Sequence, residues 1–221
     1  MRYNLRPNLS YCVIDGQAIF LDIDEDRYFR LDGSLQDAFL AYVNAEGGNA
    51  SCVGALVDRG ILVPGSATDH HPDRIQPVSR SALELDTGSG PVGIVAILRV
   101  LAIVWRMRRQ LARQRFKVVL DELVLYREMC QRHGTTPSCE AQTLDAARLF
   151  NRCRLYVPVS TSCLLDSLAM TRYLAANGIT ANIVIGVTRD PFAAHCWVQY
   201  GDVVLNDTVG NVTAHTPIRV I

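Results

Sequence analysis

Three residues near the C-terminal end of the sequence, Cys163, His195 and Asp207, have the side chains of a thiol-based catalytic triad. His195 follows Cys163 by 32 positions, and Asp207 follows His195 by 12. A thiolate is a strong nucleophile, a histidine can take or share its proton, and a carboxylate can hold the histidine in its reactive tautomer. The types and order of these residues therefore predict acyl transfer at a thiol.

The residues after Cys163 predict a helix that begins with the cysteine itself. Apolar side chains recur at helical spacing between Leu164 and Leu174, and Asn177-Gly178 is typical of a helix C-terminus. The first turn of a helix offers free backbone N–H groups and the positive end of the helix dipole, which stabilise a thiolate. We therefore expect the pKa of Cys163 to lie below the ordinary thiol value of about 8.5.

His195 and Asp207 are expected on neighbouring strands. The sequence predicts strands over 181–187, 194–200 and 203–207, the last two joined by a turn at Gly201-Asp202. If these two strands pair directly across the turn, His195 lies opposite Thr208. Asp207 then reaches His195 only through a bulge or a shift of the register by one residue.

Three segments that contain these residues resemble the B proteins of lasso-peptide biosynthesis, which carry a transglutaminase-like cysteine protease domain. The segments are Ser162-Cys163-Leu164-Leu165-Asp166-Ser167-Leu168-Ala169, Phe192-Ala193-Ala194-His195-Cys196-Trp197-Val198 and Val204-Leu205-Asn206-Asp207. The resemblance implies that Cys163, His195 and Asp207 cleave a leader from a ribosomally synthesised precursor peptide. The freed amino terminus would then be used by a separate ATP-dependent cyclase that resembles asparagine synthetase.

An oxyanion formed in such a reaction needs at least two hydrogen-bond donors. One candidate is the backbone N–H of Cys163 at the start of its helix. Papain-like enzymes supply another donor from a glutamine a short distance before the cysteine, and this sequence has no glutamine there. The pattern therefore fits transglutaminase-like enzymes better than papain-like ones.

The first 64 residues predict a small module of three strands followed by helices and a short terminal strand. The expected strands are 11–14, 17–23, 27–31 and 61–63, and the expected helices are 34–47 and 51–58. This order resembles the winged-helix-like PqqD-like modules that recognise precursors in lasso-peptide systems. The predicted fold class is α+β, with a PqqD-like module over 1–64, a linker over 65–91 and a transglutaminase-like or papain-like cysteine protease domain over 92–221. In that domain the helix of Cys163 is expected to pack on an antiparallel sheet.

A leader peptide could bind to the first module as an additional strand. An open edge on the third strand would accept an extended peptide, and the following helix would form specificity pockets. The residues predicted to contact the leader are Tyr28, Phe29 and Leu31 on the strand and Val53, Leu56 and Val57 on the helix. The same residues could instead build the module's own core. Asp22 and the acidic turn 24–26 could attract a basic leader or simply be solvated.

Two further segments have a distinctive composition. Residues 64–91 are rich in Pro, Gly, Ser, Thr and Asp, which predicts a linker that lets a bound leader present its cleavage site to the second domain. Residues 92–105 are nearly all apolar and predict a buried helix too short to cross a bilayer. The basic side chains between Arg106 and Lys117 predict a solvated helix face or a docking surface for a partner such as the cyclase.

The overall composition narrows the class of protein. The 221-residue chain has 22 basic and 22 acidic side chains, so nucleic acid is not an implied partner of the whole molecule. Its seven cysteines show no disulfide framework, and residues 1–11 lack an apolar signal core, so a cytoplasmic location is expected. No cofactor is predicted. No metal site is predicted either, because Cys130, His133 and Cys139 offer only three ligands and the adjacent His70 and His71 would point apart.

Two other functions remain open from the sequence. The same three residue types serve transglutaminases and arylamine N-acetyltransferases, in which an amine rather than water takes the acyl group. The chain could also be a non-catalytic, peptide-binding scaffold with a vestigial triad. Both alternatives keep the expected fold and differ in what happens at Cys163.

Overall fold

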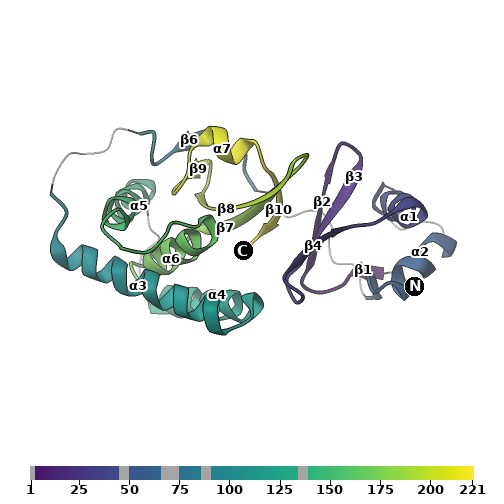
Figure 1. Cartoon of the computed structure of the whole chain (residues 1–221), viewed down its shortest axis with the longest axis horizontal. Helices are drawn as coiled ribbons and strands as arrows, with labels where there is room; N and C mark the ends of the chain where they lie inside the picture. Colours follow the sequence, from purple (N-terminus) through teal and green to yellow (C-terminus); the bar gives the residue numbers. More distant parts are fainter. Residues whose placement is uncertain (1–2, 45–49, 66–74, 86–90, 134–138) are drawn as a thin grey trace. The chain divides into compact units, whose positions relative to one another are not determined.

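The computed structural model describes residues 3–44, 50–65, 75–85, 91–133 and 139–221 (Figure 1). The chain divides into two compact units. The first comprises Met1–Arg74 with Thr216–Arg219, and the second comprises Ile75–His215 with Val220–Ile221. His70 and His71, which the sequence analysis set aside as metal ligands, lie outside the described residues.

The first unit contains a three-stranded antiparallel sheet, two helices and a two-stranded sheet. The larger sheet has the order β2-β3-β4, with β2 at Leu9–Ile14, β3 at Gln17–Asp22 and β4 at Arg27–Arg30. The helices are α1 (Gly33–Asn44) and α2 (Ala50–Asp58), and the small sheet pairs β1 (Tyr3–Leu5) with β5 (Leu62–Pro64). The expected strands and helices are present with shifted ends, and β1 is an element that the sequence analysis did not predict.

A tight turn sets the register of the first two strands of the larger sheet. Asp15 and Gly16 both have positive φ angles, of 48° and 76°, as the two central residues of a type I′ hairpin turn require. Glycine adopts this conformation without strain, and aspartate tolerates it better than most residues. The resulting register sets Tyr11 opposite Phe20.

Aromatic rings form the centre of the first unit. The centroid of the Phe20 ring lies 4.7 Å from that of Phe39 on α1 and 5.0 Å from that of Phe29 on β4. The Tyr11 ring meets Phe39 edge-on at 4.9 Å. Stacked and edge-to-face rings at these distances attract one another beyond the effect of the area they bury. Ring contacts therefore hold α1 on the sheet.

Asp22 is a buried acidic residue of this unit whose partners are internal. Its carboxylate pairs with Arg6 at 2.5 Å and accepts the backbone N–H groups of Asp24 and Glu25 at 3.1 and 3.2 Å. These contacts fix the turn after β3. Asp22 therefore does not face solvent as a contact for a basic leader, whereas Glu25 and Asp26 are exposed.

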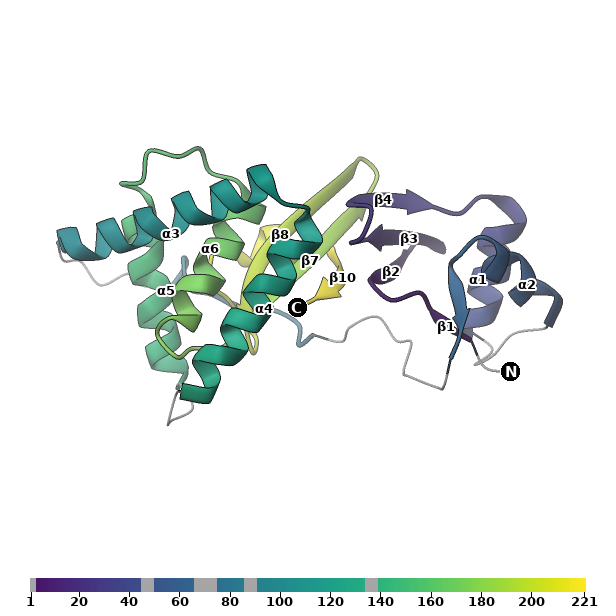
Figure 2. The ribbon, with the colours of Figure 1, turned by 90° about the horizontal axis from the view of Figure 1, so that it is seen from below.

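One mixed sheet and a group of helices make up the second unit. The sheet has the order β10-β7-β8-β9-β6, with strands at Arg80–Ser81 (β6), Asn182–Arg189 (β7), Phe192–Tyr200 (β8), Val203–Val204 (β9) and Thr216–Val220 (β10). The first four residues of β10, Thr216–Arg219, are grouped with the first unit. The helices are α3 (Ile94–Arg113), α4 (Phe116–His133), α5 (Glu140–Arg154), α6 (Cys163–Ala175) and α7 (Val209–Thr213). Helix α6 packs against β8 and also contacts α3, α4 and α5. Figures 1 and 2 show α6 between the strands β7 and β8 and the helices α3 and α4.

The strand after the β8 hairpin turn is shorter than predicted. Its register is the expected one, but β9 ends at Val204 rather than at Asp207. Beyond that point the Asn206 side chain, instead of a backbone carbonyl, accepts the Val198 N–H at 2.8 Å. The chain therefore bends out of the sheet, and this bend replaces the bulge or register shift that was expected before Asp207.

Part of the predicted linker is folded into the second unit. Strand β6 pairs in parallel with β9. The Arg80 guanidinium donates to both carboxylate oxygens of Asp202, at 2.7 and 3.1 Å. The linker prediction over 65–91 is therefore wrong around β6, because a two-residue strand held by a distant ion pair leaves no periodic pattern in the sequence.

Helix α3 is exposed along one face, which corrects the prediction of a buried helix over 92–105. Its Val100, Val104 and Met107 side chains are buried, and the helix packs on α5 and α6. Large apolar side chains are exposed on the remaining surface of α3: Ile94, Val95, Leu98 and Trp105. Because the segment is apolar on both faces, its periodicity does not distinguish them. Among the described residues, no helix is long and apolar enough to span a membrane.

Candidate active site

Cys163 is the first residue of α6, and its thiol forms a hydrogen bond with His195. This hydrogen bond is the largest cause of a pKa for Cys163 below the ordinary thiol value. Partial burial opposes the change, and hydrogen bonds from the backbone of Cys196 and Leu164 lower the pKa further. The thiol is therefore placed where it loses its proton more readily than a free cysteine.

His195 lies on β8, opposite Gly186 of β7. Its Nε2 atom is hydrogen bonded to Asp207 Oδ2, which leaves Nδ1 as the ring nitrogen for the thiol. The hydrogen bond with Cys163 is the largest cause that raises the pKa of His195, partial burial opposes it, and Asp207 adds to the increase. A lowered thiol pKa beside a raised imidazole pKa favours a thiolate–imidazolium pair. The two groups then titrate as a pair rather than singly.

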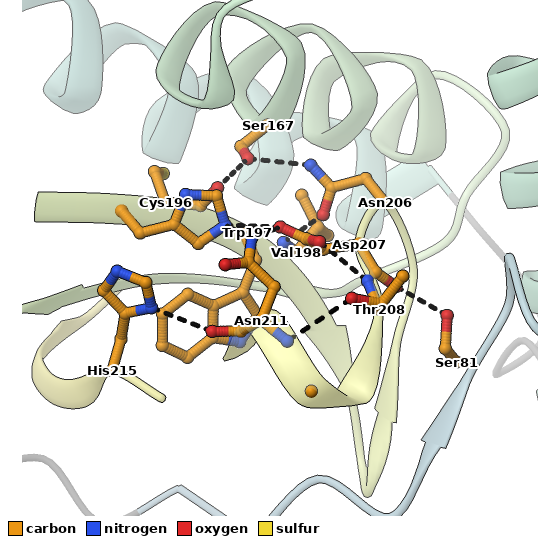
Figure 3. A network of polar contacts seen from close by, with 12 residues as sticks. Ser81, Ser167, Cys196, Trp197, Val198, Asn206, Asp207, Thr208, Asn211 and His215 are labelled. Carbon is orange, nitrogen blue, oxygen red and sulfur yellow. Dashed lines mark hydrogen bonds and ion pairs between the residues drawn. The ribbon is translucent and has the colours of Figure 1, made fainter. Parts of the chain in front are cut away.

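Asp207 follows the bend after β9, and hydrogen bonds hold it on several sides (Figure 3). Its Oδ1 atom accepts the Thr208 N–H at 2.7 Å, and Oδ2 accepts an N–H of the Asn211 side chain at 2.9 Å. Its backbone carbonyl accepts the Ser81 hydroxyl at 2.5 Å. These contacts fix the orientation in which the carboxylate meets the imidazole of His195.

Two residues that the sequence analysis did not select lie beside this pair. The Nδ2 atom of Asn211 on α7 is 3.3 Å from His195 Nε2 as well as bonded to Asp207. The Asn211 carbonyl lies 2.8 Å from His215 Nδ1, and the centroid of the His215 ring lies 5.1 Å from that of His195. Thr208 is the N-cap of α7 and accepts the Asn211 N–H. This cap, directly after Asp207, is the sequence signal that could have indicated Asn211.

A glycine allows side chains to pack closely below the imidazole. A Cβ atom at Gly186 would lie 2.7 Å from the Trp197 ring and 3.1 Å from the Cβ of His215. The Trp197 ring lies 6.0 Å from that of His195, with 22° between the ring planes. The missing side chain at Gly186 therefore lets two rings support the orientation of His195.

A polar bridge joins α6 to the hairpin (Figure 3). The Ser167 hydroxyl donates to the Cys196 carbonyl at 3.0 Å and accepts from the Asn206 side chain at 2.9 Å. The Cys196 thiol is buried, and desolvation raises its pKa to about 12. Cys196 is therefore a core residue beside His195, and its thiol is unsuited to act as a second nucleophile.

Comparison with known families assigns this arrangement to a superfamily. Residues 98–220 match the family model described as the transglutaminase-like superfamily, and this segment contains Cys163, His195 and Asp207. The chain belongs to the transglutaminase-like superfamily. The microcin J25-processing protein McjB of Escherichia coli is 45% identical over 47 residues, which cover 21% of this chain and 23% of McjB. No solved structure gave a significant match.

Membership in the transglutaminase-like superfamily agrees with what the geometry allows chemically. A nucleophile at a helix start, a base on the adjacent strand and an orienting carboxylate after the bend form the arrangement used for acyl transfer. Within the described ranges, no group of three or more His, Cys, Asp or Glu side chains is placed to hold a metal ion. The chemistry that the site itself supports is therefore attack by the Cys163 thiolate on an acyl group.

The six residues predicted to contact a leader fall into two groups in the first unit. Leu31, Val53 and Leu56 are buried and belong to its hydrophobic core. Tyr28, Phe29 and Val57 are only partly buried, and Phe29 and Val57 pack against that core. The side chains of the first group are thus occupied by internal packing, and those of the second group retain accessible surface.

Proposed function

We propose that this chain is a cysteine leader peptidase of lasso-peptide maturation, which binds a precursor peptide and hydrolyses the bond between leader and core. The observation that carries the proposal is the hydrogen-bonded set of Cys163, His195 and Asp207, in which the thiol pKa is lowered and the imidazole pKa is raised. The identity to McjB, a protein named for processing microcin J25, supports a peptide substrate.

The reaction begins with attack of the Cys163 thiolate on the carbonyl carbon of the last leader residue. The backbone N–H of Cys163 is suited to stabilise the resulting oxyanion. The His195 imidazolium gives its proton to the leaving nitrogen of the core, the C–N bond breaks, and a thioester to the leader remains. Asp207 stays ionised and holds the Nε2–H of His195.

Hydrolysis of the thioester completes the cycle. Neutral His195 takes a proton from water as the water oxygen attacks the thioester carbonyl. The C–S bond breaks, the leader leaves with a new carboxylate, and the thiolate–imidazolium pair is restored. The core leaves with a free amino terminus, the group that a cyclase of the asparagine-synthetase-like type would use.

We assign recognition of the leader to the first unit, in line with its resemblance to PqqD-like modules. Strand β4 is the last strand in the β2-β3-β4 order, the position at which an extended peptide can extend a sheet. Tyr28, Phe29 and Val57 are the proposed side-chain contacts, because they combine accessible surface with a place on β4 or α2. Binding there would raise the effective concentration of the cleavage site at Cys163.

We propose that the protein acts in the cytoplasm. We also propose that its cyclase partner docks on the exposed face of α3. This helix contains five arginines and no acidic residue. Trp105, Arg106, Arg109 and Arg113 help to line a pocket of about 650 Å³. Such a surface favours an acidic partner with apolar groups. If α3 is the docking surface, Arg109→Glu will weaken binding of the purified cyclase in a pull-down, and unchanged binding would place the contact elsewhere.

A precursor-cleavage assay tests the peptidase assignment. The substrate is a synthetic precursor peptide, chosen from the short reading frames next to the gene of this protein, and the masses of its products are measured by mass spectrometry. We expect cleavage by the wild-type chain, none by Cys163→Ala, and normal cleavage by Cys139→Ser, which alters an exposed thiol elsewhere in the second unit. Cleavage by Cys163→Ala at the normal rate would contradict the proposal and favour the scaffold alternative.

An acyltransferase of the transglutaminase or arylamine N-acetyltransferase type is the second candidate. It is favoured by the superfamily match, because the same three residues serve enzymes that pass the acyl group to an amine. The two candidates share the thioester and differ in the group that resolves it. The fate of the leader carbonyl therefore separates them.

A further inference from the structure

Helix α5 carries a buried arginine that binds the segment leading to the nucleophile. Arg154 is 7% exposed. Its Nε donates to Asp166 Oδ1 at 2.7 Å, and its Nη atoms donate to three backbone carbonyls of the segment before α6. These carbonyls are those of Val157 at 3.3 Å, Val159 at 2.9 Å and Ser160 at 3.3 Å. One guanidinium thus fixes an irregular segment, in which the Val157 carbonyl also accepts the Val159 N–H at 2.8 Å.

Asp166 connects this arginine to the start of α6. It lies in the first turn of the helix, and its Oδ2 atom accepts the Ser162 N–H at 3.3 Å. Ser162 immediately precedes Cys163, so the residue before the nucleophile and the turn after it are both tied to Arg154. Rotation of the helix start would break these contacts together.

A second polar residue on α5 binds the segment that leads to Asp207. Asn151, three positions before Arg154, donates from Nδ2 to the Leu205 carbonyl at 2.8 Å. Leu205 lies at the beginning of the bend that brings Asp207 to His195. The same helix therefore contacts the approach to Cys163 and the approach to Asp207, which are far apart in the sequence.

We propose that Asn151 and Arg154 are positioning residues, through which α5 sets the separation of the Cys163 thiol from the His195–Asp207 pair. Both residues act through hydrogen bonds to backbone carbonyls, and Arg154 also acts through Asp166. Neither residue touches the reacting atoms. The proposal rests on the proposed function only in taking Cys163, His195 and Asp207 as the reactive residues. It does not depend on which peptide is cleaved. Arg154 binds Asp166 and the backbone before α6 rather than the thiol, so the proposed influence on Cys163 is geometric.

Alkylation of Cys163 measures this geometry without any substrate. Iodoacetamide modifies the thiolate form of cysteine. Mass spectrometry of the peptide that contains Cys163 gives the alkylation rate at each pH from 4 to 10, and the midpoint of this pH dependence is the pKa of the thiol. If Arg154 holds the thiol at His195, Arg154→Met will raise the midpoint toward the ordinary value of about 8.5. Arg154→Lys keeps the charge but cannot span Asp166 and three carbonyls, so we expect an intermediate midpoint.

Two more variants keep the test decisive. Asp166→Asn preserves volume and an acceptor for the Ser162 N–H but removes the ion pair, and it replaces Arg154→Met if that variant does not fold. Arg148→Gln is the matched control, because Arg148 is on α5 and pairs with Asp145 of the same helix at 3.5 Å. Its midpoint is expected to stay at the wild-type value.

Asn151→Leu tests the other half of the proposal. Loss of the bond to Leu205 loosens the bend before Asp207, so kcat for precursor cleavage is expected to fall about tenfold at unchanged KM, which is about 1.4 kcal/mol. If the variants at Arg154 and Asp166 lower the Tm but keep the wild-type alkylation midpoint, the residues only stabilise the fold and the proposal is wrong. Shifted midpoints in a protein that fails to cleave any precursor would uphold the positioning role and contradict only the proposed function.

Discussion

The surroundings of Phe20 in the first unit and of His195 in the second are built from different interactions. Phe20 is held by ring contacts with Phe29 and Phe39, which are not directional enough to orient a reacting atom. His195 donates from Nε2 to the Asp207 carboxylate, which itself accepts hydrogen bonds from the Asn211 side chain and the Thr208 N–H. Aromatic packing provides a stable platform for binding, whereas the polar network fixes angles and pKa values. The difference agrees with the proposal that the first unit binds the leader and the second performs the chemistry.

The largest expected effect breaks the polar network at its centre. Replacing His195 with alanine removes the base and the main cause of the lowered Cys163 pKa. Cleavage should fall by a factor on the order of 10² to 10⁴. In the wild-type chain the thiolate persists at lower pH than in a free cysteine, so the alkylation midpoint of Cys163 should rise in the variant to about 8.5. A midpoint that does not move would mean that His195 does not control the thiol.

The second prediction breaks the aromatic cluster and spares the network. Phe39→Ala leaves a cavity among buried rings, and we expect the first unit to lose about 3–5 kcal/mol of stability. Leader binding, measured by fluorescence anisotropy, should weaken, while the alkylation midpoint of Cys163 stays unchanged. Val13→Ala, at an exposed position on β2 of the same unit, is the control and should alter neither quantity. A changed midpoint in Phe39→Ala would show that the two regions are not separable.

A smaller effect is expected from the edge of the network. Asn211→Ala removes one of the donors that hold Asp207, while Thr208 and Ser81 keep their bonds to it. The kcat for cleavage should fall about tenfold, or about 1.4 kcal/mol. KM should stay constant if Asn211 only orients the carboxylate. A rise in KM with constant kcat would instead place Asn211 in substrate binding.

The smallest effect is expected where a polar contact is exposed. Hydrogen bonds with Asp202 are the largest cause that raises the pKa of Arg80, and the Arg80 side chain is 40% exposed. Exposed ion pairs contribute little and are weakened by salt. Arg80→Gln should lower the Tm by no more than a few degrees, and less so at 1 M salt, without changing the alkylation of Cys163. A large loss of activity would mean that β6 helps to shape the site through Ser81.

The sequence predicts the reactive residues better than it predicts what holds them. Cys163, His195 and Asp207 have distinctive side chains, and the structure brings them together from the start of α6, from within β8 and from the bend after β9. Their supports are common polar residues whose partners are distant in the chain: Asn151, Arg154, Asn206 and Asn211. The bend after β9 depends on a side chain replacing a backbone acceptor, which no strand pattern indicates.

Apolar residues are less informative than polar ones about exposure. Leu56 and Val57 are adjacent on α2 and equally apolar, yet only Leu56 is fully buried. On α3, the exposed Leu98 and the buried Val100 belong to the same apolar run. Most elements of the first unit follow from periodicity and turns, but the face that a helix exposes depends on its neighbours in space.

The central claim is that water resolves a thioester formed between Cys163 and the leader. The most direct test is precursor cleavage in water enriched in oxygen-18, with the leader product weighed by mass spectrometry. Hydrolysis predicts one heavy oxygen in the new leader carboxylate and a core with a free amino terminus, both absent with Cys163→Ala. A leader that carries a new amide and no heavy oxygen would contradict the account and make the protein an acyltransferase.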